Sequence, residues 1–329
     1  MDNISSGAAV TIIVVAHNSA RYRARQMAAL AAQTIQIWRL IYVDNSSRPI
    51  ERPSQSELME GAVLIQNEEN LGFAAANNRA AETVRTEFIA FLNPDAFPEP
   101  DWLEQLLAGA RRHPNAAAFA SLQLMDAADD KFDGAGDVMH ASGLYYRALH
   151  GKTANGVALS EGGVFSACAA AALYRTQWFH KLGGFDEDFF CYGEDVDLGF
   201  RLRLAGGATI LIPAARVQHV GGGASEFADY YGARNRVWVF LKNMPLALLI
   251  ALSLPFISSN LILIAAHGRN GRRRTQWSGF RDGCKSAHAM IAKRNAIHRN
   301  RAISTLKLAA MLTWSPQALV NCRGKILDR

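Results

Sequence analysis

Apolar runs of strand length alternate with amphipathic stretches of helical spacing through the first third of the chain. Apolar runs bounded by turn residues predict β-strands, and stretches with apolar residues every three or four positions predict α-helices. Strands are expected at 10–16, 39–44, 62–67 and 87–93, and helices at 21–33, 73–84 and 100–113. This alternation predicts an α/β fold with a Rossmann-like, mostly parallel sheet and helices on both faces.

The pattern becomes less regular after the first third of the chain. Residues 126–163 are rich in Gly and Asp, and such a long non-repetitive stretch is either a functional flap or plain surface. Buried structure is expected again at 163–175, followed by a strand at 208–213 and an amphipathic helix at 229–243.

Residues 246–266 carry no charge over 21 positions, which is long enough to span a bilayer. Pro255 is expected to split this segment into two short halves. A single span would place the basic C-terminal tail outside if the N-terminal region is cytosolic, against the positive-inside rule. We therefore favour an in-plane or re-entrant helical hairpin, which keeps the tail beside anionic headgroups. A buried helical pair in a soluble protein is the alternative.

The net charge of +6 is distributed unevenly along the 329 residues. Residues 1–267 hold 21 Lys and Arg against 27 Asp and Glu, whereas residues 268–329 hold 14 against 2. A basic tail binds an anionic polymer or an anionic membrane surface, and the adjoining apolar segment favours the membrane over nucleic acid. The four cysteines lack metal or disulfide spacing, and the first residues lack a signal-peptide pattern, which predicts reduced thiols in a cytosolic protein.

Polar side chains follow three of the predicted strands. They are His17 and Asn18, the stretch 44–47, and Asn93 with Asp95. Ligands bind at the carboxyl ends of the strands in a parallel sheet, so these side chains are candidates for ligand contacts. Turn formation is the alternative for the stretch DNSS, because Asp, Asn and Ser are common turn residues.

Three carboxylates crowd into the four positions that follow Gly193. Acids in a first helical turn are favoured by the helix dipole, so capping of a helix is one explanation. Glu194 and Asp197 share a helical face, whereas Asp195 is rotated about 100° away and is free to face a cleft. A carboxylate held there is a candidate general base.

Five motifs follow one another along the chain. They are VDNSS (43–47), NLGFAAANN (70–78), FLNPDA (91–96), GGFDEDFFCYGEDVDLGFRLRLAGG (183–207) and HVGGGAS (219–225). In this order they resemble a family 2 glycosyltransferase with the GT-A fold, in particular the bacterial rhamnosyltransferases and their galactofuranosyltransferase relatives. The resemblance covers roughly residues 8–245, and SGFRDG (278–283) is similar to the membrane-proximal end of such enzymes.

The resemblance implies an inverting transfer from a nucleotide-diphosphate sugar. Asp195 occupies the base position of the family's ED motif and would accept the proton of the attacking hydroxyl. Glu194 would position the acceptor or Asp195, and Asp197 would hold the helix start or pair with an arginine. A covalent glycosyl-enzyme is disfavoured, because the sequence places no second acid opposite Asp195.

The resemblance also implies a donor site and a phosphate site. Asp44 matches the acid that recognises the nucleotide base or ribose, and Gly72 would permit close backbone approach. Arg234 and Asn235 lie where relatives place groups near phosphates or the acceptor, with an exposed helical face as the alternative. The expected nucleotide-sugar contacts are His17, Asn18, Asp44, Asn45, Asn70, Gly72, Phe73, Asn77, Asn93 and Asp95.

A divalent cation, Mg²⁺ or Mn²⁺, is the implied cofactor, because the departing diphosphate needs charge compensation. Metal-dependent members usually carry Asp-x-Asp, whereas this chain has Asn93-Pro94-Asp95, so Asn93 offers only an amide oxygen. Asp95 and His219 are the expected ligands, with a structural role as the alternative for His219.

These assignments divide the chain into a catalytic domain at 1–245 and an apolar hairpin with a basic tail at 246–329. Within the first domain, a nucleotide-binding half is expected at about 8–125 and an acceptor half at about 126–245. The predicted function is transfer of rhamnose from dTDP-rhamnose to a lipid-linked or cell-surface polysaccharide acceptor, at the cytoplasmic face of the bacterial inner membrane. Galactofuranosyl or other hexosyl transfer is one alternative. A non-catalytic nucleotide-sugar-binding or scaffold protein, favoured only by Asn93, is another, and the oligomeric state is left open.

Overall fold

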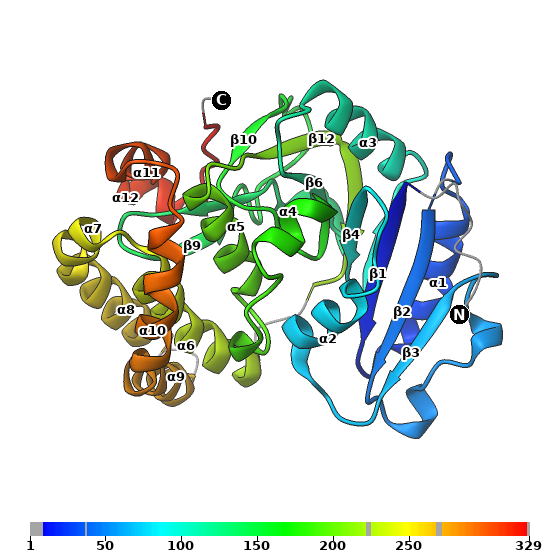
Figure 1. Ribbon diagram of the computed structural model, residues 1–329, viewed down its shortest axis with the longest axis horizontal. Coiled ribbons are helices and arrows are strands. Elements are labelled where there is room, and N and C mark those ends of the chain that lie inside the picture. Colours follow the sequence, from blue (N-terminus) through cyan, green and yellow to red (C-terminus); the bar gives the residue numbers. More distant parts are fainter. Residues whose placement is uncertain (1–8, 37, 222–224, 268–271, 328–329) are drawn as a thin grey trace.

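A central β-sheet with helices on both faces adjoins a group of C-terminal helices (Figure 1). The computed structural model describes residues 9–327, apart from 37, 222–224 and 268–271. The strands of the main sheet are β1 (Val10–Ala16), β2 (Trp38–Asn45), β3 (Val63–Asn67), β4 (Phe88–Leu92), β5 (Ala96–Pro98), β6 (Ala118–Met125), β7 (Ala128–Gly134), β10 (Gly162–Val164), β11 (Ala171–Arg175) and β12 (Thr209–His219). Their order is β10-β12-β6-β11-β4-β1-β2-β3, with β5 paired to β12 and β7 to β6.

Six helices accompany the sheet and its connections. They are α1 (Ala20–Ala31), α2 (Gly72–Ala81), α3 (Trp102–Arg112), α4 (Thr176–Lys181), α5 (Glu194–Leu204) and α6 (Glu226–Asn243), with short 3-10 turns at Pro49–Glu51, Gln55–Glu57 and Glu187–Phe189. The side chains of β1 alternate between two cores. Ile13 and Val15 belong to the core that contains α2 and α5, whereas Ile12 and Val14 pack with α1 and α3. The predicted covering of both sheet faces is therefore confirmed.

The sheet is mixed rather than mostly parallel. β1 to β4, the four strands predicted in the first third, are all present, and β1 pairs in parallel with β2 and β4, as β2 does with β3. β11, however, runs antiparallel to both of its neighbours, β4 and β6. The regular strand–helix alternation that favours parallel pairing ends after α3, and the strands from β6 to β11 follow one another without a helix between them, which allows either direction.

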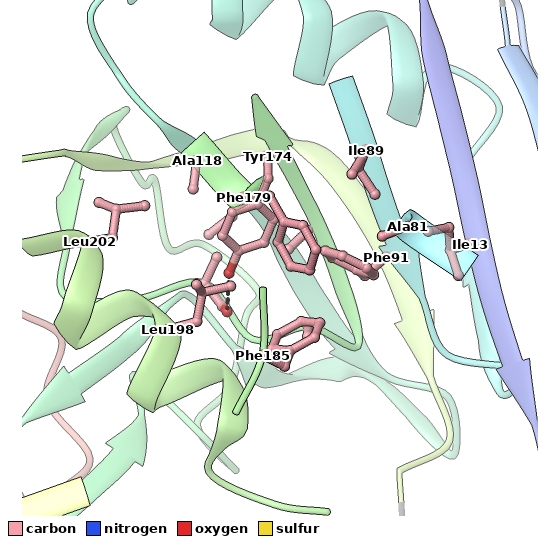
Figure 2. Close-up of a cluster of buried hydrophobic side chains, with 14 of the residues drawn as sticks. Ile13, Ala81, Ile89, Phe91, Ala118, Tyr174, Phe179, Phe185, Leu198 and Leu202 are labelled. Atoms are coloured by element: carbon pink, nitrogen blue, oxygen red, sulfur yellow. Dashed lines mark hydrogen bonds between the residues drawn. The ribbon is translucent and has the colours of Figure 1, made fainter. Parts of the chain in front are cut away.

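Aromatic residues join α5 and the segment before it to the sheet (Figure 2). The Phe91 ring lies 5.0 Å from that of Phe179 and 4.9 Å from that of Phe185, measured between centroids. Leu198 and Leu202, on one face of α5, complete the same core. Tilted aromatic contacts at these distances are favourable, and they set the position of α5 against the carboxyl ends of the central strands.

The Gly- and Asp-rich stretch 126–163 is largely regular structure up to residue 147, whereas residues 151–161 are irregular and mostly exposed, as expected of plain surface. It forms β7, β10 and a separate two-stranded sheet of β8 (Asp137–Met139) and β9 (Tyr145–Arg147). Residues 135–144 are buried throughout. The segment is thus an ordered wall of the molecule, although its glycines break the alternation by which a strand is usually recognised.

The C-terminal helices (Figure 1) are α7 (Leu246–Ala251), α8 (Ser253–His267), α9 (Arg273–Lys285), α10 (Ala287–Arg299), α11 (Thr305–Met311) and α12 (Pro316–Val320). α9 and α10 pack directly against α6, and α8 contacts it through Phe256, whose ring stacks on that of Phe240 at 4.2 Å. The apolar segment is split, as predicted, but at Leu252 rather than at Pro255, which sits in the first turn of α8 where proline is tolerated. Within the described residues no helix combines the length and apolar character needed to cross a bilayer.

Two glycines explain the spacing of the SGFRDG motif. A Cβ on Gly279 would lie 2.2 Å from the Tyr230 carbonyl oxygen, and one on Gly283 would lie 2.8 Å from that of Arg234. Side chains at these two positions, four residues apart on one face of α9, would therefore push the helix away from α6. The motif is a close helix–helix contact, and it anchors the basic tail to α6.

Candidate active site

A cavity of about 320 Å³ lies beside the start of α5. Its wall combines the β8–β9 sheet, the segment 168–170, the segment 191–196 and the first turns of α6. It brings together four of the predicted site residues, Phe73, Asn93, Glu194 and Asp195. A larger surface hollow of about 780 Å³, at the amino end of β4, contains none of them.

Gly193 allows α5 to begin directly at the cavity. Its φ is +83°, a conformation that glycine adopts readily, and a Cβ would lie 2.4 Å from the Tyr145 hydroxyl. The helix then begins at Glu194, as predicted, with its three acids in the first turn. The positive end of the helix dipole favours negative charge there.

Asp195 is held with both carboxylate oxygens oriented by main-chain amides. Oδ1 accepts from the Val196 amide at 2.8 Å, and Oδ2 accepts from the Ala169 amide at 3.0 Å. The side chain is half-buried and lines the cavity. Charge-assisted hydrogen bonds of this kind fix a carboxylate and leave lone pairs for a substrate proton.

Two further carboxyl groups flank Asp195. Burial and the charge of Asp195 raise the pKa of Glu194 well above its usual value and that of Asp137 to about 8. Asp137 accepts a hydrogen bond from the Ser166 hydroxyl at 2.8 Å, whereas Glu194 Oε2 has no hydrogen-bond partner among the described residues. The site therefore places Asp195 beside Asp137, which is protonated at neutral pH, and beside Glu194, whose pKa is shifted in the same direction; the sequence did not reveal Asp137.

Asp197, the third acid of the motif, points away from the cavity. It is fully buried and pairs with Arg201 at 2.8 Å, Lys242 at 2.8 Å and the Asn243 amide at 2.7 Å. Although burial opposes ionisation, Lys242 and Arg201 lower the pKa of Asp197 to about 2. The predicted pairing with an arginine is confirmed, and the role of Asp197 is structural.

Asp95 and His219 lie together at the junction of β5 and β12. His219 Nε2 is 3.4 Å from Asp95 Oδ1, and His219 Nδ1 is 2.8 Å from Asp133 Oδ2. An octahedral Mg²⁺ holds its ligands at about 2.1 Å, which separates neighbouring ligand atoms by about 3 Å. The two predicted ligands therefore fit a divalent cation, with Asp133 orienting the imidazole from behind.

The protein offers few ligands to such a cation. The described residues contain no cluster of three or more His, Cys, Asp or Glu with metal-binding geometry. The Asn93 side-chain nitrogen Nδ2 is 3.5 Å from His219 Nε2. The amide group of Asn93 therefore lies close enough for its oxygen to serve as a weak ligand. Phosphate oxygens and water would have to complete the coordination, which is usual for Mg²⁺.

Asp133 is the residue of this region that the sequence did not reveal. It also pairs with Arg147 and lies 3.4 Å from His150 Nδ1. Despite its burial, these bases and His219 hold the pKa of Asp133 well below its usual value. The only signal in the sequence was its place in the Asp-rich stretch after residue 126.

Asp44 is the second-to-last residue of β2, and its two carboxylate oxygens have different surroundings. Oδ1 accepts from the Ser47 amide at 3.3 Å, which is the turn expected of DNSS. Oδ2 has no hydrogen-bond partner among the described residues, and Arg52 Nε is 3.9 Å away. Nearby, His17 Nδ1 is 2.9 Å from the main-chain carbonyl oxygen of Asn45, and the side-chain nitrogen Nδ2 of Asn18 is 3.0 Å from His17 Nε2. The Asp44 side chain is buried, and its contact with a nucleotide stays a prediction.

Asn45 and the asparagines of the NLGFAAANN motif form hydrogen bonds within the protein. Asn45 Nδ2 donates to Asn70 Oδ1 at 2.8 Å, and Asn77 Nδ2 donates to the Phe73 carbonyl at 2.9 Å. Gly72 has φ +79°, and a Cβ there would lie 2.5 Å from the Phe190 carbonyl oxygen. The close approach expected at Gly72 is therefore made by Phe190, and nucleotide contacts from Asn45, Asn70 and Asn77 stay predictions.

Arg234 and Asn235 also support main chain. Asn235 is fully buried, and its amide donates to the carbonyls of Phe189, Cys191 and Tyr192 at 3.0, 2.9 and 2.6 Å. Arg234 donates to the Phe189 carbonyl at 2.8 Å and lies over the Trp238 ring. The pair holds the loop that precedes Asp195, and a phosphate or acceptor contact from either residue stays a prediction.

Comparison with known proteins links this architecture to sugar transfer. The model of "Glycosyl transferase family 2" matches residues 11–183, more than half of the chain. Polypeptide N-acetylgalactosaminyltransferase 4 of Caenorhabditis elegans is 23% identical over 265 residues, which cover 72% of this chain and 45% of that protein. N-acetylglucosaminyl-diphospho-decaprenol L-rhamnosyltransferase of Mycobacterium tuberculosis is 28% identical over 230 residues, covering 63% of this chain and 75% of that protein. This chain therefore spans less than half of the first relative.

Two solved structures share the fold. GalNAc-T7, crystallised with UDP, GalNAc and Mn²⁺, superposes with a TM-score of 0.56 at 15% identity, covering 72% of this chain and 48% of that chain. S. aureus TarS superposes with a TM-score of 0.51 at 15% identity, covering 88% of this chain and 90% of that chain. The mixed α/β architecture with its curled central sheet is thus that of the GT-A structures.

Proposed function

This chain belongs to glycosyl transferase family 2, and from that premise we propose that it transfers a sugar from a nucleotide-diphosphate donor with inversion of configuration, with Asp195 as general base. The observation that carries the proposal is the orientation of Asp195. Two main-chain amides fix its carboxylate at the wall of the 320 Å³ cavity. The family match ends at residue 183, so the role of Asp195 rests on this geometry and on its motif.

In the proposed reaction, Asp195 accepts the proton of an acceptor hydroxyl as that oxygen attacks the anomeric carbon. The bond from the anomeric carbon to the diphosphate breaks on the opposite side, and the nucleoside diphosphate leaves. Glu194 lines the same cavity, and in its protonated form it would donate a hydrogen bond that positions the acceptor. Asp137, also protonated, is a poor nucleophile, which supports direct displacement over a covalent intermediate.

Asp95 and His219 would hold Mg²⁺ or Mn²⁺ against the diphosphate, and Asp133 would keep the His219 imidazole in the ligating orientation. When bound, the cation offsets the charge that develops on the leaving group. The unused oxygen of Asp44 would contact the base or ribose of the donor. A GT-A neighbour that contains UDP and Mn²⁺ supports this arrangement.

The donor and acceptor are proposed from the relatives. The rhamnosyltransferase relative acts, by its name, on a sugar linked to decaprenol through a diphosphate. We therefore place dTDP-rhamnose first among donors and a lipid-linked or polysaccharide acceptor first among acceptors. Galactofuranosyl and other hexosyl donors come next.

Membrane association at the cytoplasmic face is part of the proposal. α7 has no buried residue, and Leu254 and Ile262 of α8 are 72% and 69% exposed. Arg273 and Arg274 are exposed beside Trp277, at a hollow shared with the end of α8. An apolar face bordered by arginines and a tryptophan suits shallow insertion among anionic headgroups.

Nucleoside-diphosphate release by the detergent-solubilised protein tests the proposal. The donors are dTDP-rhamnose, UDP-galactofuranose, UDP-galactose, UDP-glucose and GDP-mannose, each with Mg²⁺ and a bacterial membrane-lipid extract. We expect acceptor-dependent release from one donor, reduced at least about 100-fold by Asp195→Asn. Donor binding without release, equal in both proteins, would instead support the non-catalytic alternative.

A further inference from the structure

Four aromatic side chains form a continuous patch at the mouth of the active-site cavity. This aromatic patch consists of Phe190, Tyr192, Phe227 and Tyr231. The Phe227 ring lies 4.6 Å from that of Tyr231 and 6.0 Å from that of Tyr192, and Phe190 stacks on Tyr231 at 5.3 Å. The patch joins the loop before α5 to the first turns of α6.

The patch is both exposed and continuous with the catalytic cavity. Tyr192 is 37% exposed and Phe227 is 47% exposed. Tyr192 lines the cavity together with Asp195, as do Ala228 and Gly232 of α6. A molecule that reaches Asp195 from this side must therefore pass over the patch.

The loop that carries the patch is held in an unusual backbone conformation. Phe190 and Tyr192 have φ values of +63° and +67°, where bulky residues are rarely found. The Asn235 amide binds three carbonyls of this loop, and the Phe190 carbonyl accepts from the Phe73 amide at 2.6 Å. Outliers that are fixed by so many partners cluster at functional sites, and here they present two rings to solvent.

We propose that the aromatic patch is the subsite for the sugar ring of the acceptor. A sugar ring has an apolar face of C–H groups, and the negative face of an aromatic ring attracts such groups. A ring stacked on Tyr192 and Phe227 would direct its hydroxyls toward the cavity that contains Asp195. The inference rests on the proposed function and specifies its acceptor: a glycoside rather than a simple alcohol or a peptide hydroxyl.

Saturation-transfer NMR tests the subsite without requiring turnover. The full chain, in a detergent without a sugar headgroup, is irradiated at its aromatic protons in the presence of methyl α-L-rhamnopyranoside or methyl N-acetyl-β-D-glucosaminide. Phe227 is the first choice for substitution, because it lies in the regular first turn of α6. Phe227→Leu keeps an apolar side chain without the aromatic face, and Phe227→Trp keeps the aromatic face. Trp314→Leu, at an exposed aromatic residue outside the patch, is the matched control.

We expect transfer to the ring protons of at least one glycoside with the unmodified protein. Binding should be about fivefold weaker in Phe227→Leu, and close to unchanged in Phe227→Trp and Trp314→Leu. Absence of transfer in the unmodified protein, or equal transfer in Phe227→Leu, would refute the subsite. Transfer that the control also loses would show non-specific contact and refute it as well.

Nucleoside-diphosphate release, measured on the same proteins, separates this inference from the proposed function. If release is normal and Phe227→Leu leaves the KM for the acceptor extract unchanged, the subsite is wrong and the transferase proposal stands. If no donor is turned over but the glycosides bind at the patch, the transferase proposal fails and a sugar-binding site remains. Loss of vesicle flotation in Phe227→Leu, with no change in glycoside binding, would assign the patch to the membrane instead.

Discussion

Replacing Lys242 with methionine tests how the catalytic helix is held in place. Lys242 of α6 is buried, and its amino group bonds to Asp186, in the segment before α5, and to Asp197 of α5 at 2.8 Å. Methionine fills similar space without the charge. Removing one partner of a buried ion pair costs about 3–5 kcal/mol. Because Arg201 and Asn243 still contact Asp197, we expect about 3 kcal/mol.

The pH dependence of stability gives a second estimate of the free energy that the ionised Asp197 contributes to folding. The pKa of Asp197 is about 2 in the folded protein against 3.8 as its ordinary value, which corresponds to about 2 kcal/mol. Since the folded pKa is the lower one, this stabilisation is present above pH 3.8 and is lost as the pH falls through about 2. Lys242→Met should reduce this dependence, because Lys242 is the largest favourable influence on the carboxylate.

Urea unfolding followed by tryptophan fluorescence, at pH 7 and at steps down to pH 2, measures both effects. Lys285→Met, at an exposed lysine in the last turn of α9, is the control and should change stability by less than about 0.5 kcal/mol. The double variant with Asp197→Asn should lose less than the two single variants together. A loss below about 1 kcal/mol in Lys242→Met, with unchanged acid dependence, would refute the assignment of this network.

Three further predictions concern the site and the tail. Asp133→Asn should weaken Mn²⁺ binding, measured by calorimetry, by about tenfold, because the His219 imidazole loses the carboxylate that orients it. An unchanged Mn²⁺ affinity would mean that His219 is not a ligand. Glu194→Gln should leave kcat/KM near neutral pH close to that of the unmodified protein. It should also remove the decline of kcat/KM expected at alkaline pH, where Glu194 loses its proton above its raised pKa. A loss of activity that is equal at every pH would contradict a protonated Glu194. The double variant Ile250→Glu, Leu254→Glu should lower partition onto anionic vesicles by about tenfold. The control Ile50→Glu, at a remote exposed position, should leave partition unchanged. Equal flotation of the unmodified protein, the double variant and the control would rule out docking through α7 and α8.

Several features of the molecule could be predicted from local pattern alone. The four strands of the first third, the start of α5 at Glu194 and the interruption of the apolar tail all follow from spacing, glycine and length. Each depends on residues within one element, and local periodicity reports such elements directly. The motif order likewise identified the family and singled out Asp195, because each motif is a short run of residues that can be recognised without knowing the fold.

Long-range packing decided the remaining features of the site. Asp133 reaches His219 across 86 positions of sequence, and the irregular stretch that contains it showed no strand period. Asn235 and Gly72 looked like ligand contacts, yet their neighbours are the carbonyls of the 189–192 loop. A polar side chain in sequence can satisfy either the protein's own main chain or a ligand, and only the fold shows which.

Tertiary packing, rather than local sequence, also decided the direction of β11 and the position of Asp137 beside Asp195. The composition of β11 is that of a buried strand in either direction, and its antiparallel course depends on which neighbours lie free beside it. Asp137 is placed near Asp195 by β8, and burial there rather than its own chemistry keeps it protonated. The sequence alone thus determined the family and the strands and helices of the first third, and the tertiary structure decided which groups surround Asp195, because proximity and burial depend on the packing of distant segments.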